Sequence, residues 1–505
     1  MKKNARFFFG LFGGLLAPLL IILFVDLDPS KPAVTYTLAI AVLMAIWWIT
    51  EVVPLAVTSL LPVVLFPAFG ILNGKTVSSA YFNDVIFLFL GGFLLALAMQ
   101  KWNLHKRIAL KILHFTGVSR GRILLGFMLA TAFLSMWISN TATAMMMIPI
   151  VISVISQMEE QFGKENTRKY AIGLLLAIAY SASTGGIATL VGTPPNLAFA
   201  RIFSISFPHA PEISFGQWMI FALPVSIAIL MVIFIYLYFV FCKSKSEDEN
   251  DINPPDFSSH YRALGPFKTE EKVILAAFLL FALLLLFRSE IQLGSIKIPG
   301  WSMLFAEPAF LNDGTIAIFI GVILFMIPSK TGKEMLLDWE TARQLPWHIV
   351  ILFGGGFALA EGFIASGLSE WIGNSMQSVS GFHPLLVIII LTTIMIFLTE
   401  VTSNTATAQM MLPIVGALSV SAGVHPLLFM LPVTLAGSMA FMLPVATPPN
   451  AIIFGTDRIR IADMAKAGLF LNLIGIVLVS LSVWFYGRFI FDIDLQNLPD
   501  WVNFH

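Results

Sequence analysis

SNTATAMMMIPI at residues 139–150 returns as SNTATAQMMLPI at residues 403–414, with ten of twelve positions identical at an offset of 264. Two further blocks repeat in the same order: FLGGFLLA (89–96) corresponds to FGGGFALA (353–360), and GTPPN (192–196) to ATPPN (446–450). Three matched blocks in one order indicate an internal duplication. Close packing explains small residues such as the glycines, but packing alone does not require Ser-Asn-Thr and Pro-Pro-Asn within apolar segments.

The composition of the chain places it in a membrane. Its 505 residues are 58% hydrophobic and 11% charged, and the net charge is zero. Soluble domains are roughly 45–50% apolar and about 25% charged, and a chain without net charge has no global attraction to nucleic acid. The one cysteine, Cys242, excludes an internal disulfide and a thiolate metal cluster. The histidines lack metal-binding spacing, so we expect no cofactor other than a coupling ion.

The apolar segments predict an all-α polytopic membrane protein with about 11 transmembrane helices, because a spanning helix needs about 20 apolar residues. Lys2, Lys3 and Arg6 precede the first apolar segment, and no small-residue cleavage site stands before Asp26. We interpret this segment as a retained helix rather than a signal peptide, with the N-terminus cytoplasmic and the C-terminus outside. A bacterial inner membrane is the expected location.

The chain divides into matching halves, each with one Ser-Asn-Thr motif and one Pro-Pro-Asn motif, four motifs in all. Residues 1–242 form the first half, 243–272 a hydrophilic cytoplasmic linker, and 273–505 the second half. Segments 123–156 and 383–421, interrupted at Ser-Asn-Thr, are predicted as re-entrant hairpins; segments 171–203 and 426–454 are predicted as helices broken at Pro-Pro-Asn. The helix at 85–100 and its counterpart at 348–366 run in opposite directions, so the halves are predicted to be inverted repeats, which are typical of secondary transporters.

The motif residues suit an anion together with an alkali cation. Non-helical backbone at membrane depth survives only when it is buried in protein or faces a water-filled cavity, and paired prolines interrupt a helix. Free N–H groups at helix N-termini favour carboxylate, whereas free carbonyls favour Na⁺. Asn140 and Asn404 offer an amide of either role. Hydroxyl groups come from the neighbouring residues Ser139, Thr141, Ser403 and Thr405.

These oxygen ligands fit a hard cation rather than zinc or copper. The four motifs contain no Lys or Arg, so an anion bound there would hold an uncompensated charge, which costs several kcal/mol in a low-dielectric site. Bound Na⁺ would supply the missing positive charge. This argument favours cation coupling, although a water-filled cavity would weaken it.

Three acids lie within or beside the predicted spans: Glu51, Glu361 and Glu400. Acids inside a membrane are functional candidates, and Glu400 stands three residues before Ser403. We expect Glu400 to form a salt bridge or a cap that steadies the hairpin, with proton coupling as the alternative. Glu51 and Glu361 are interpreted as structural.

The paired Ser-Asn-Thr motifs, each followed by a Pro-Pro-Asn break, resemble those of the divalent anion:sodium symporter family, which includes Na⁺/dicarboxylate, Na⁺/citrate and Na⁺/sulfate cotransporters. The stretch WWITEVVPLAVTSLLPVVLFPAFGI (47–71) is similar to the early-helix signature of that family. The resemblance extends through nearly the whole chain. It implies a homodimer in which scaffold domains stay fixed while a transport domain in each subunit moves as an elevator.

The resemblance also implies ligand sets. A first sodium site would use Ser135, Ser139, Asn140 and Gly192. A second would use Thr399, Thr402, Asn404 and Ala446, with backbone carbonyls serving at Gly192, Thr402 and Ala446. The anion would lie between the two sodium sites and contact Ser139, Asn140, Thr141, Ser403, Asn404 and Thr405, with Thr193, Thr447 and Pro448 lining the pocket.

The leading functional prediction is Na⁺-coupled symport of C4 dicarboxylates such as succinate, malate or fumarate. A sodium-independent exchanger of di- or tricarboxylates is the nearest alternative, and sulfate is another cargo for the same scaffold. An intramembrane enzyme would need an acid/base or metal constellation, which the motifs lack. A channel could use the same polar breaks, but inverted hairpins fit alternating access better.

Overall fold

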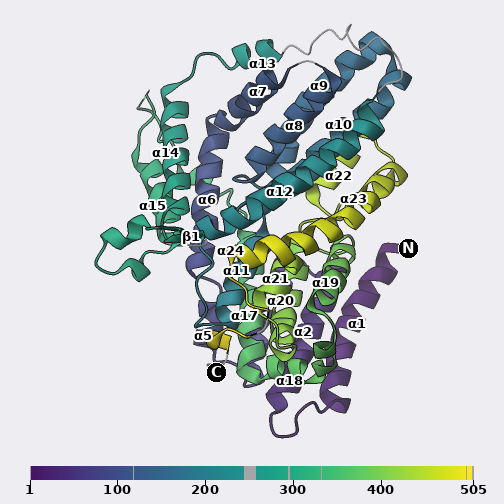
Figure 1. The fold of residues 1–505 in the computed structure, drawn as a ribbon, viewed down its shortest axis with the longest axis vertical. Helices are drawn as coiled ribbons and strands as arrows, with labels where there is room; N and C mark the ends of the chain where they lie inside the picture. The colour runs from purple at the N-terminus through teal and green to yellow at the C-terminus, as the bar shows by residue number, and fades with distance from the viewer. Residues whose placement is uncertain are drawn as a thin grey trace.

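The computed structural model describes residues 2–117, 119–243, 257–293, 296–330, 332–495 and 497–502. Within these ranges the regular structure is helical apart from one antiparallel hairpin, β1 (Ile291–Leu293) with β2 (Ile296–Ile298), and an isolated bridge. By length and composition alone, seven helices can cross a membrane, and five shorter apolar helices of 10–17 residues accompany them. The chain is therefore a polytopic helical protein (Figure 1).

The helices of the first half are α1 (Lys2–Phe24), α2 (Pro32–Thr50), α3 (Leu55–Thr58), α4 (Leu61–Ala68), α5 (Gly74–Ser79), α6 (Asp84–Lys101), α7 (Leu104–Thr116), α8 (Arg120–Ser135), α9 (Asn140–Phe162), α10 (Lys164–Ile187), α11 (Pro194–Ser206) and α12 (Phe215–Leu237). Helix α12 continues into a π-helical turn, η1 (Tyr238–Cys242), in which Cys242 is buried.

The helices of the second half are α14 (Thr269–Leu286), α15 (Asp313–Met326), α16 (Trp339–Ala342), α17 (Trp347–Ser366), α18 (Leu368–Ser375), α19 (Pro384–Thr399), α20 (Asn404–Ser421), α21 (Pro426–Ala436), α22 (Pro448–Phe454), α23 (Ile461–Leu481) and α24 (Arg488–Ile490). A π-helical segment, η6 (Ser482–Gly487), joins α23 to α24. Short 3₁₀ turns are η3 (Trp301–Leu304), η4 (Pro308–Phe310), η5 (Gln377–Gly381) and η7 (Asp500–Val502).

The described part of the predicted linker is folded rather than open. Helix α13 (Phe257–Ala263) packs on α7, and Arg107 of α7 is buried. Its guanidinium donates to Glu271 at 2.9 Å and to the carbonyls of Leu264 and Gly265. Residues 244–256 of the predicted linker lie outside the described residues.

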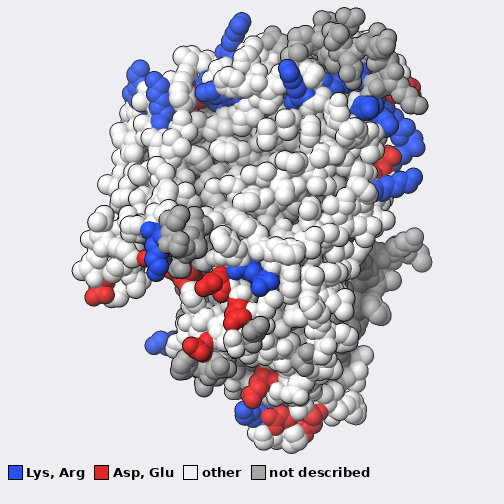
Figure 2. Space-filling model, viewed as in Figure 1, with Lys and Arg blue, Asp and Glu red and all other residues white. Residues whose placement is uncertain are grey.

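Ion pairs show which helix ends share a face of the molecule. Lys101, at the end of α6, contacts Asp338 after α15 at 2.6 Å, and this hydrogen bond lowers the pKa of Asp338 to about 2. Arg120, at the start of α8, lies over the Phe162 ring at the end of α9. Arg458 pairs with Glu159 near the same end. We call this side of the molecule the basic face; in Figure 2 many Lys and Arg side chains lie along the upper and right-hand margins.

A second set of ion pairs defines the opposite face. Arg288, at the end of α14, lies 2.5 Å from Asp313 at the start of α15 and 2.6 Å from Glu212. Arg201, near the end of α11, lies 3.8 Å from Asp84 at the start of α6. Helices α6, α14 and α15 therefore run from one face to the other.

Two antiparallel helix pairs, α8–α9 and α19–α20, contain the repeated motifs. The α8–α9 pair has both outer ends on the basic face, because Arg120 lies over Phe162. The α19–α20 pair has its outer ends elsewhere: Ser421 donates to the Gly373 carbonyl of α18, the helix that directly follows α17. Helix α11 packs on α20, and its counterpart α22 packs on α9. The short helix after the break in each half thus packs on the motif-bearing helix of the other half.

The helix breaks differ in detail from the sequence prediction. Pro194-Pro195 and Pro448-Pro449 do not lie inside the breaks but form the first turns of α11 and α22. A first helical turn needs no N–H from its residues, so proline is favoured there. The apolar segment 54–72 is not one helix but is split into α3 and α4, because Pro62 has no N–H for the carbonyl of Thr58.

Candidate functional site

Four helices begin at one cavity of about 610 Å³. They are α9, α11, α20 and α22, whose N-cap residues are Ser139, Thr193, Ser403 and Thr447. Ser139 Oγ accepts from the Ala142 N–H, and Thr447 Oγ1 accepts from the Asn450 N–H. Serine and threonine are favoured at these positions because their oxygens satisfy N–H groups that lack a helical partner. The two repeats therefore converge on a single cavity.

The cavity gathers most of the residues proposed from the sequence. It is lined by Ser139, Asn140, Thr141, Gly192, Thr193, Thr402, Ser403, Asn404, Thr405, Ala446, Thr447 and Pro448. Ser135 and Thr399 are fully buried and hydrogen-bond to the lining residues Asn140 and Asn404. Segments more than 200 residues apart in the sequence are thus brought together.

Each asparagine is part of a cluster of oxygens. Ser135 Oγ lies 2.5 Å from Asn140 Oδ1 and 2.7 Å from the Ala182 carbonyl. One hydroxyl has one proton, so three close oxygens share a single hydrogen. In the second half, the Thr399 hydroxyl contacts Asn404 Oδ1 and lies 3.4 Å from the Gly437 carbonyl. Such clusters are deficient in positive charge and fit a hard cation.

Gly186 of α10 leaves room beside the first cluster. A Cβ atom on Gly186 would lie 2.6 Å from Asn140 Oδ1 and 3.1 Å from the Gly192 carbonyl oxygen. Both oxygens belong to the first predicted sodium site. The absence of a side chain at Gly186 therefore keeps a small space open between two of the expected ligands.

The electrostatics of the cavity favour an anion beside cations. Among the described lining residues, the ionisable side chains are those of Glu51 and His348, and none is Lys or Arg. Helices α9, α11 and α20 have 23, 13 and 18 residues, and their positive N-terminal ends meet there. Within the described ranges, no group of three or more His, Cys, Asp or Glu could hold a metal. Apart from Glu51 and His348, the polar groups offered by the described lining residues are neutral hydroxyl, amide and backbone groups.

Comparison with known proteins identifies the family. Residues 10–493 match the model described as "Sodium:sulfate symporter transmembrane region". The chain belongs to this family. A "Sodium-dependent dicarboxylate transporter SdcS" of Staphylococcus saprophyticus is 44% identical over 512 residues, covering 99% of this chain and 96% of the relative. The SdcS of Staphylococcus aureus is also 44% identical, covering 99% and 95%.

Two solved structures have a similar fold. Neisseria gonorrhoeae MtrF, described as illuminating a class of antimetabolite efflux pumps, has a TM-score of 0.55 at 14% identity, covering 84% of this chain and 85% of MtrF. The YdaH transporter of Alcanivorax borkumensis has a TM-score of 0.55 at 12% identity, covering 80% and 86%. At these identities the likeness concerns the fold alone.

In this member of the symporter family, Glu400 caps the second helix break. Its carboxylate is buried and accepts from the backbone N–H groups of Phe441, Met442 and Leu443 at 2.7–3.0 Å, and from Asn472 Nδ2 at 2.7 Å. Glu400 is thus a cap, one of the two structural roles expected for it, but the capped segment is the loop before α22 and not the predicted hairpin 383–421. The other acids differ: Glu51 is exposed at the cavity, and Glu361 lies 4.0 Å from Arg201.

Sequence reasoning missed Gly186, Asn196 and Asn450. Asn196 Nδ2 donates to the carbonyls of Gly186, Ile187 and Thr189, and Asn450 Nδ2 donates to those of Ala440 and Leu443. The repeated asparagine after each proline pair was the available signal. Gly186 has no such signal, since its role depends on how closely α10 approaches α9.

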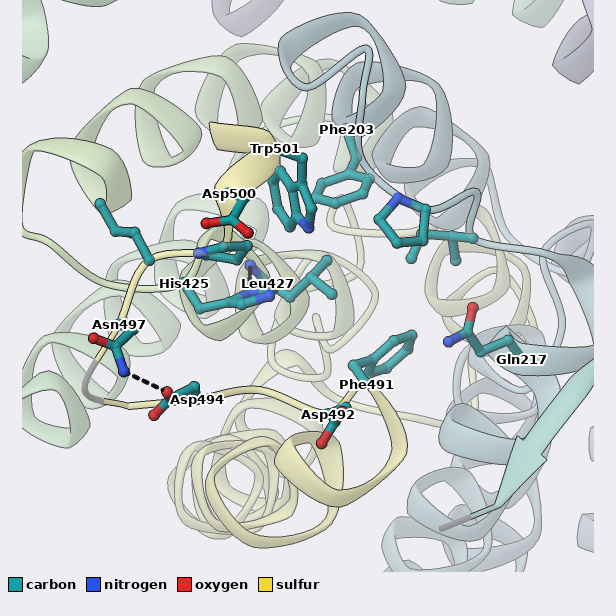
Figure 3. Close-up of a pocket in the computed structure, with 14 residues that line it drawn as sticks. Phe203, Gln217, His425, Leu427, Phe491, Asp492, Asp494, Asn497, Asp500 and Trp501 are labelled. Carbon is teal, nitrogen blue, oxygen red and sulfur yellow. Dashed lines mark hydrogen bonds between the residues drawn. The ribbon is translucent and has the colours of Figure 1, made fainter. Parts of the chain in front are cut away.

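A second cavity, of about 390 Å³, lies apart from the first. Figure 3 shows Trp501 beside Phe203 and His425, with Gln217 and Asp492 across the cavity. The Trp501 ring contacts the rings of Phe203 and His425 at 5.8 and 5.4 Å, so the C-terminal segment is packed on the helices. None of the residues proposed from the sequence lines this cavity.

Proposed function

We propose that this chain is a secondary active transporter, not an enzyme, that moves C4 dicarboxylates such as succinate, malate and fumarate inward together with Na⁺. The observation that carries the proposal is the pair of oxygen clusters at Asn140 and Asn404, facing one cavity into which three substantial helix N-termini point. The names of the 44% identical relatives support both sodium dependence and the dicarboxylate cargo.

The two clusters are the proposed sodium sites. Na⁺ would be held in the first by Ser135, Ser139, Asn140 and the Gly192 carbonyl, and in the second by Thr399, Asn404 and the carbonyls of Thr402 and Ala446. The dicarboxylate would lie between them, with each carboxylate near one Ser-Asn-Thr motif and with Thr193, Thr447 and Pro448 around it. Sodium neutralises the negative charge of the cargo, which allows it to enter a cavity lined by neutral dipoles.

The proposed architecture has about 11 transmembrane helices and two re-entrant hairpins, α8–α9 and α19–α20. Residues 1–242 and 273–505 would be inverted repeats on either side of the cytoplasmic linker 243–272. The exchanged packing of α11 on α20 and α22 on α9 supports this relation. The chain would lie in a bacterial plasma membrane with its N-terminus cytoplasmic and its C-terminus outside, because the basic face follows the positive-inside rule.

The transport cycle is proposed to be an elevator movement within each subunit of a homodimer. We infer that this conformer has its cavity toward the basic face, because α17 begins shortly after Asp338, which pairs with Lys101 on that face. Glu51 and His348 line the cavity and stand where α2 ends and α17 begins. These ends lie together, since α2 packs on α17 and Lys31, at the start of α2, approaches Gly367 at the end of α17. An elevator would bring the same residues to the opposite face.

Uptake of labelled succinate into proteoliposomes under separately imposed Na⁺, K⁺ and H⁺ gradients tests the proposal. We expect uptake with an inward Na⁺ gradient only, and competition by unlabelled malate and fumarate. Uptake that ignores Na⁺ but requires preloaded dicarboxylate would establish an exchanger instead. Strong competition by sulfate would change the proposed cargo.

The two motif asparagines provide the second test. Asn140→Ala and Asn404→Ala each remove a ligand shared by an ion and the anion, so we expect succinate uptake to fall at least 100-fold, as for loss of two good contacts at roughly 1.4 kcal/mol per tenfold. Ser183→Ala, at a buried residue of α10 outside the cavity lining, is the matched control. Full transport by either asparagine variant would remove that side chain from the site.

A further inference from the structure

We propose that Asn196 and Asn450 are positioning residues for the two coupling cations. Each side-chain amide neutralises the carbonyls on one side of a helix break and leaves the carbonyl of Gly192 or Ala446 for the ion. The inference rests on the proposed function and deepens it, because it assigns a task to the Pro-Pro-Asn motifs. It stands on geometry that recurs in both halves of the molecule.

The first step of the argument concerns the side-chain amides. Asn196 and Asn450 are both fully buried. Asn196 Nδ2 lies 3.2, 3.1 and 2.8 Å from the carbonyls of Gly186, Ile187 and Thr189. Asn450 Nδ2 lies 3.0 Å from each carbonyl of Ala440 and Leu443. Residues 186 and 189 correspond to residues 440 and 443 at the offset that relates Asn196 to Asn450, so the same clamp occurs twice.

The orientation of both amides is fixed by these contacts. With Nδ2 on the carbonyls, Oδ1 of each asparagine is buried and has no hydrogen-bond partner among the residues that the structure describes. The reverse orientation would place an oxygen against two or three carbonyl oxygens. A buried unpaired acceptor is unfavourable, and its presence at both positions indicates that the donation to carbonyls is what the two sites require.

The second step concerns the carbonyls of Gly192 and Ala446, which receive no hydrogen bond from the Pro-Pro-Asn motifs. The residues that follow Thr193 and Thr447 are paired prolines, which have no N–H. The next N–H groups are committed: that of Asn196 donates to the Thr193 carbonyl, and that of Asn450 to Thr447 Oγ1. The motif therefore offers no hydrogen bond to the carbonyl of Gly192 or of Ala446.

Several other polar groups at the breaks also have partners. Trp218 Nε1 donates to the Ile187 carbonyl, and the Tyr180 hydroxyl donates to the Phe441 carbonyl. Glu400 accepts from the N–H groups of Phe441, Met442 and Leu443. The Gly192 oxygen, in contrast, borders the space beside Asn140 Oδ1 that a Cβ on Gly186 would enter. The proline pairs provide no N–H group, and the asparagine amides bind carbonyls on the other side of each break. The carbonyl oxygens of Gly192 and Ala446 therefore remain available at the proposed cation sites.

The test uses Asn196→Asp and Asn450→Asp in the full-length protein. Each change keeps the shape of the side chain but replaces the donor by oxygen, which repels the clamped carbonyls and disturbs the break. We expect the Na⁺ concentration that gives half-maximal succinate uptake to rise at least tenfold. The KM for succinate measured at saturating Na⁺ should change less than threefold. Ser183→Ala and Ser480→Ala are the matched controls, because each removes a buried hydroxyl that has no partner within the described part of the chain.

A binding readout independent of transport separates positioning from folding. Na⁺ without succinate should raise the melting temperature of the detergent-solubilised protein, because a ligand of the native state stabilises it. In both Asp variants this stabilisation curve should shift to at least tenfold higher Na⁺. We expect the same shift for Asn196→Ala and Asn450→Ala, which do not bury a carboxyl group. The test can therefore still be made if the Asp variants fail to fold.

The outcomes are distinguishable. Reduced uptake with an unshifted Na⁺ curve in either assay would overturn the assignment and make the asparagines purely structural. Failure of the Ala variants to fold would do the same. A wild-type protein whose uptake and melting temperature ignore Na⁺ would refute the proposed function itself.

Discussion

At the residue scale, Gly186 determines how much room lies beside Asn140 Oδ1, an expected ligand of the first proposed sodium site. A Cβ atom on Gly186 would lie 2.6 Å from Asn140 Oδ1 and 3.1 Å from the Gly192 carbonyl oxygen. The first distance is too short for a carbon–oxygen contact, so a methyl group there would displace the Asn140 side chain. The need for glycine is thus steric and local.

We predict that Gly186→Ala raises the Na⁺ concentration for half-maximal uptake more than tenfold while the protein remains folded. The methyl group would compete with the ion for the space between two ligands. A titration of uptake against Na⁺ measures the effect. Gly455→Ala is the control, because its Cβ would meet only ordinary contacts at 3.4 and 3.5 Å; equal titration curves for both variants would contradict the prediction.

Site residues could be predicted from the sequence where they belong to a repeated motif. Ser139, Asn140, Ser403 and Asn404 stand in matching blocks, and the structure places all four at one cavity. Gly186 lies in no repeated block, and its role appears only when α10 approaches α9. Contacts between segments of this kind are not encoded in local spacing, so they could not be inferred without the fold.

At the scale of elements, the two helix breaks are built differently. The first is held by the Thr189 hydroxyl, which donates to the Met136 carbonyl at 2.5 Å and accepts from the Gly192 N–H. The second is held by Glu400, which occupies the position that corresponds to Met136 and receives four hydrogen bonds. A buried carboxylate thus replaces a neutral hydroxyl as the organiser of the loop.

We predict that Glu400→Ala destabilises the protein by roughly 3 kcal/mol or more, since several buried donors would lose their acceptor at about 1–3 kcal/mol each. Thermal unfolding in detergent measures the change. Glu400→Gln retains one oxygen and should cost less. Glu51→Ala, at an exposed acid, is the control for loss of a carboxylate; a wild-type melting temperature for Glu400→Ala would refute the capping role.

The sequence predicted the existence of these elements better than their limits. Periodic apolar segments and paired prolines indicated the helices and their interruptions. The interruptions fall before the prolines, because Pro194 and Pro448 begin new helices rather than ending old ones. The division of 54–72 at Pro62 and the burial of Arg107 against the linker depend on packing partners distant in the sequence, which a local reading does not contain.

At the scale of the whole molecule, a buried ion pair within the second half holds the start of α12, on the face opposite the basic one. Arg288 and Asp313 are both buried, and Asp313 also accepts from the Phe215 N–H at the start of α12. Glu212, which precedes α12, pairs with the outer end of the guanidinium, and its side chain is 58% exposed. The segment of the first half that begins α12 therefore contacts both members of this pair, Asp313 through the Phe215 N–H and Arg288 through Glu212.

We predict that Arg288→Ala destabilises the protein by about 3–5 kcal/mol, because it leaves the Asp313 charge buried without its partner. Glu212→Gln should cost at most about 1 kcal/mol, as is usual for an exposed pair. Thermal unfolding of the two variants side by side gives the comparison. Equal losses for both would show that burial does not govern this contact.

The burial of Cys242 has a practical consequence for experiments that follow the proposed elevator movement. This sulfur is buried in the π-helical turn after α12, close to Gly173, and the sequence contains no other thiol. A spin label or fluorophore attached to a newly introduced cysteine at the mouth of the cavity would therefore report from that place alone. In the proposed homodimer, distances between probes in the two subunits could then be recorded with the native chemistry of the rest of the chain undisturbed.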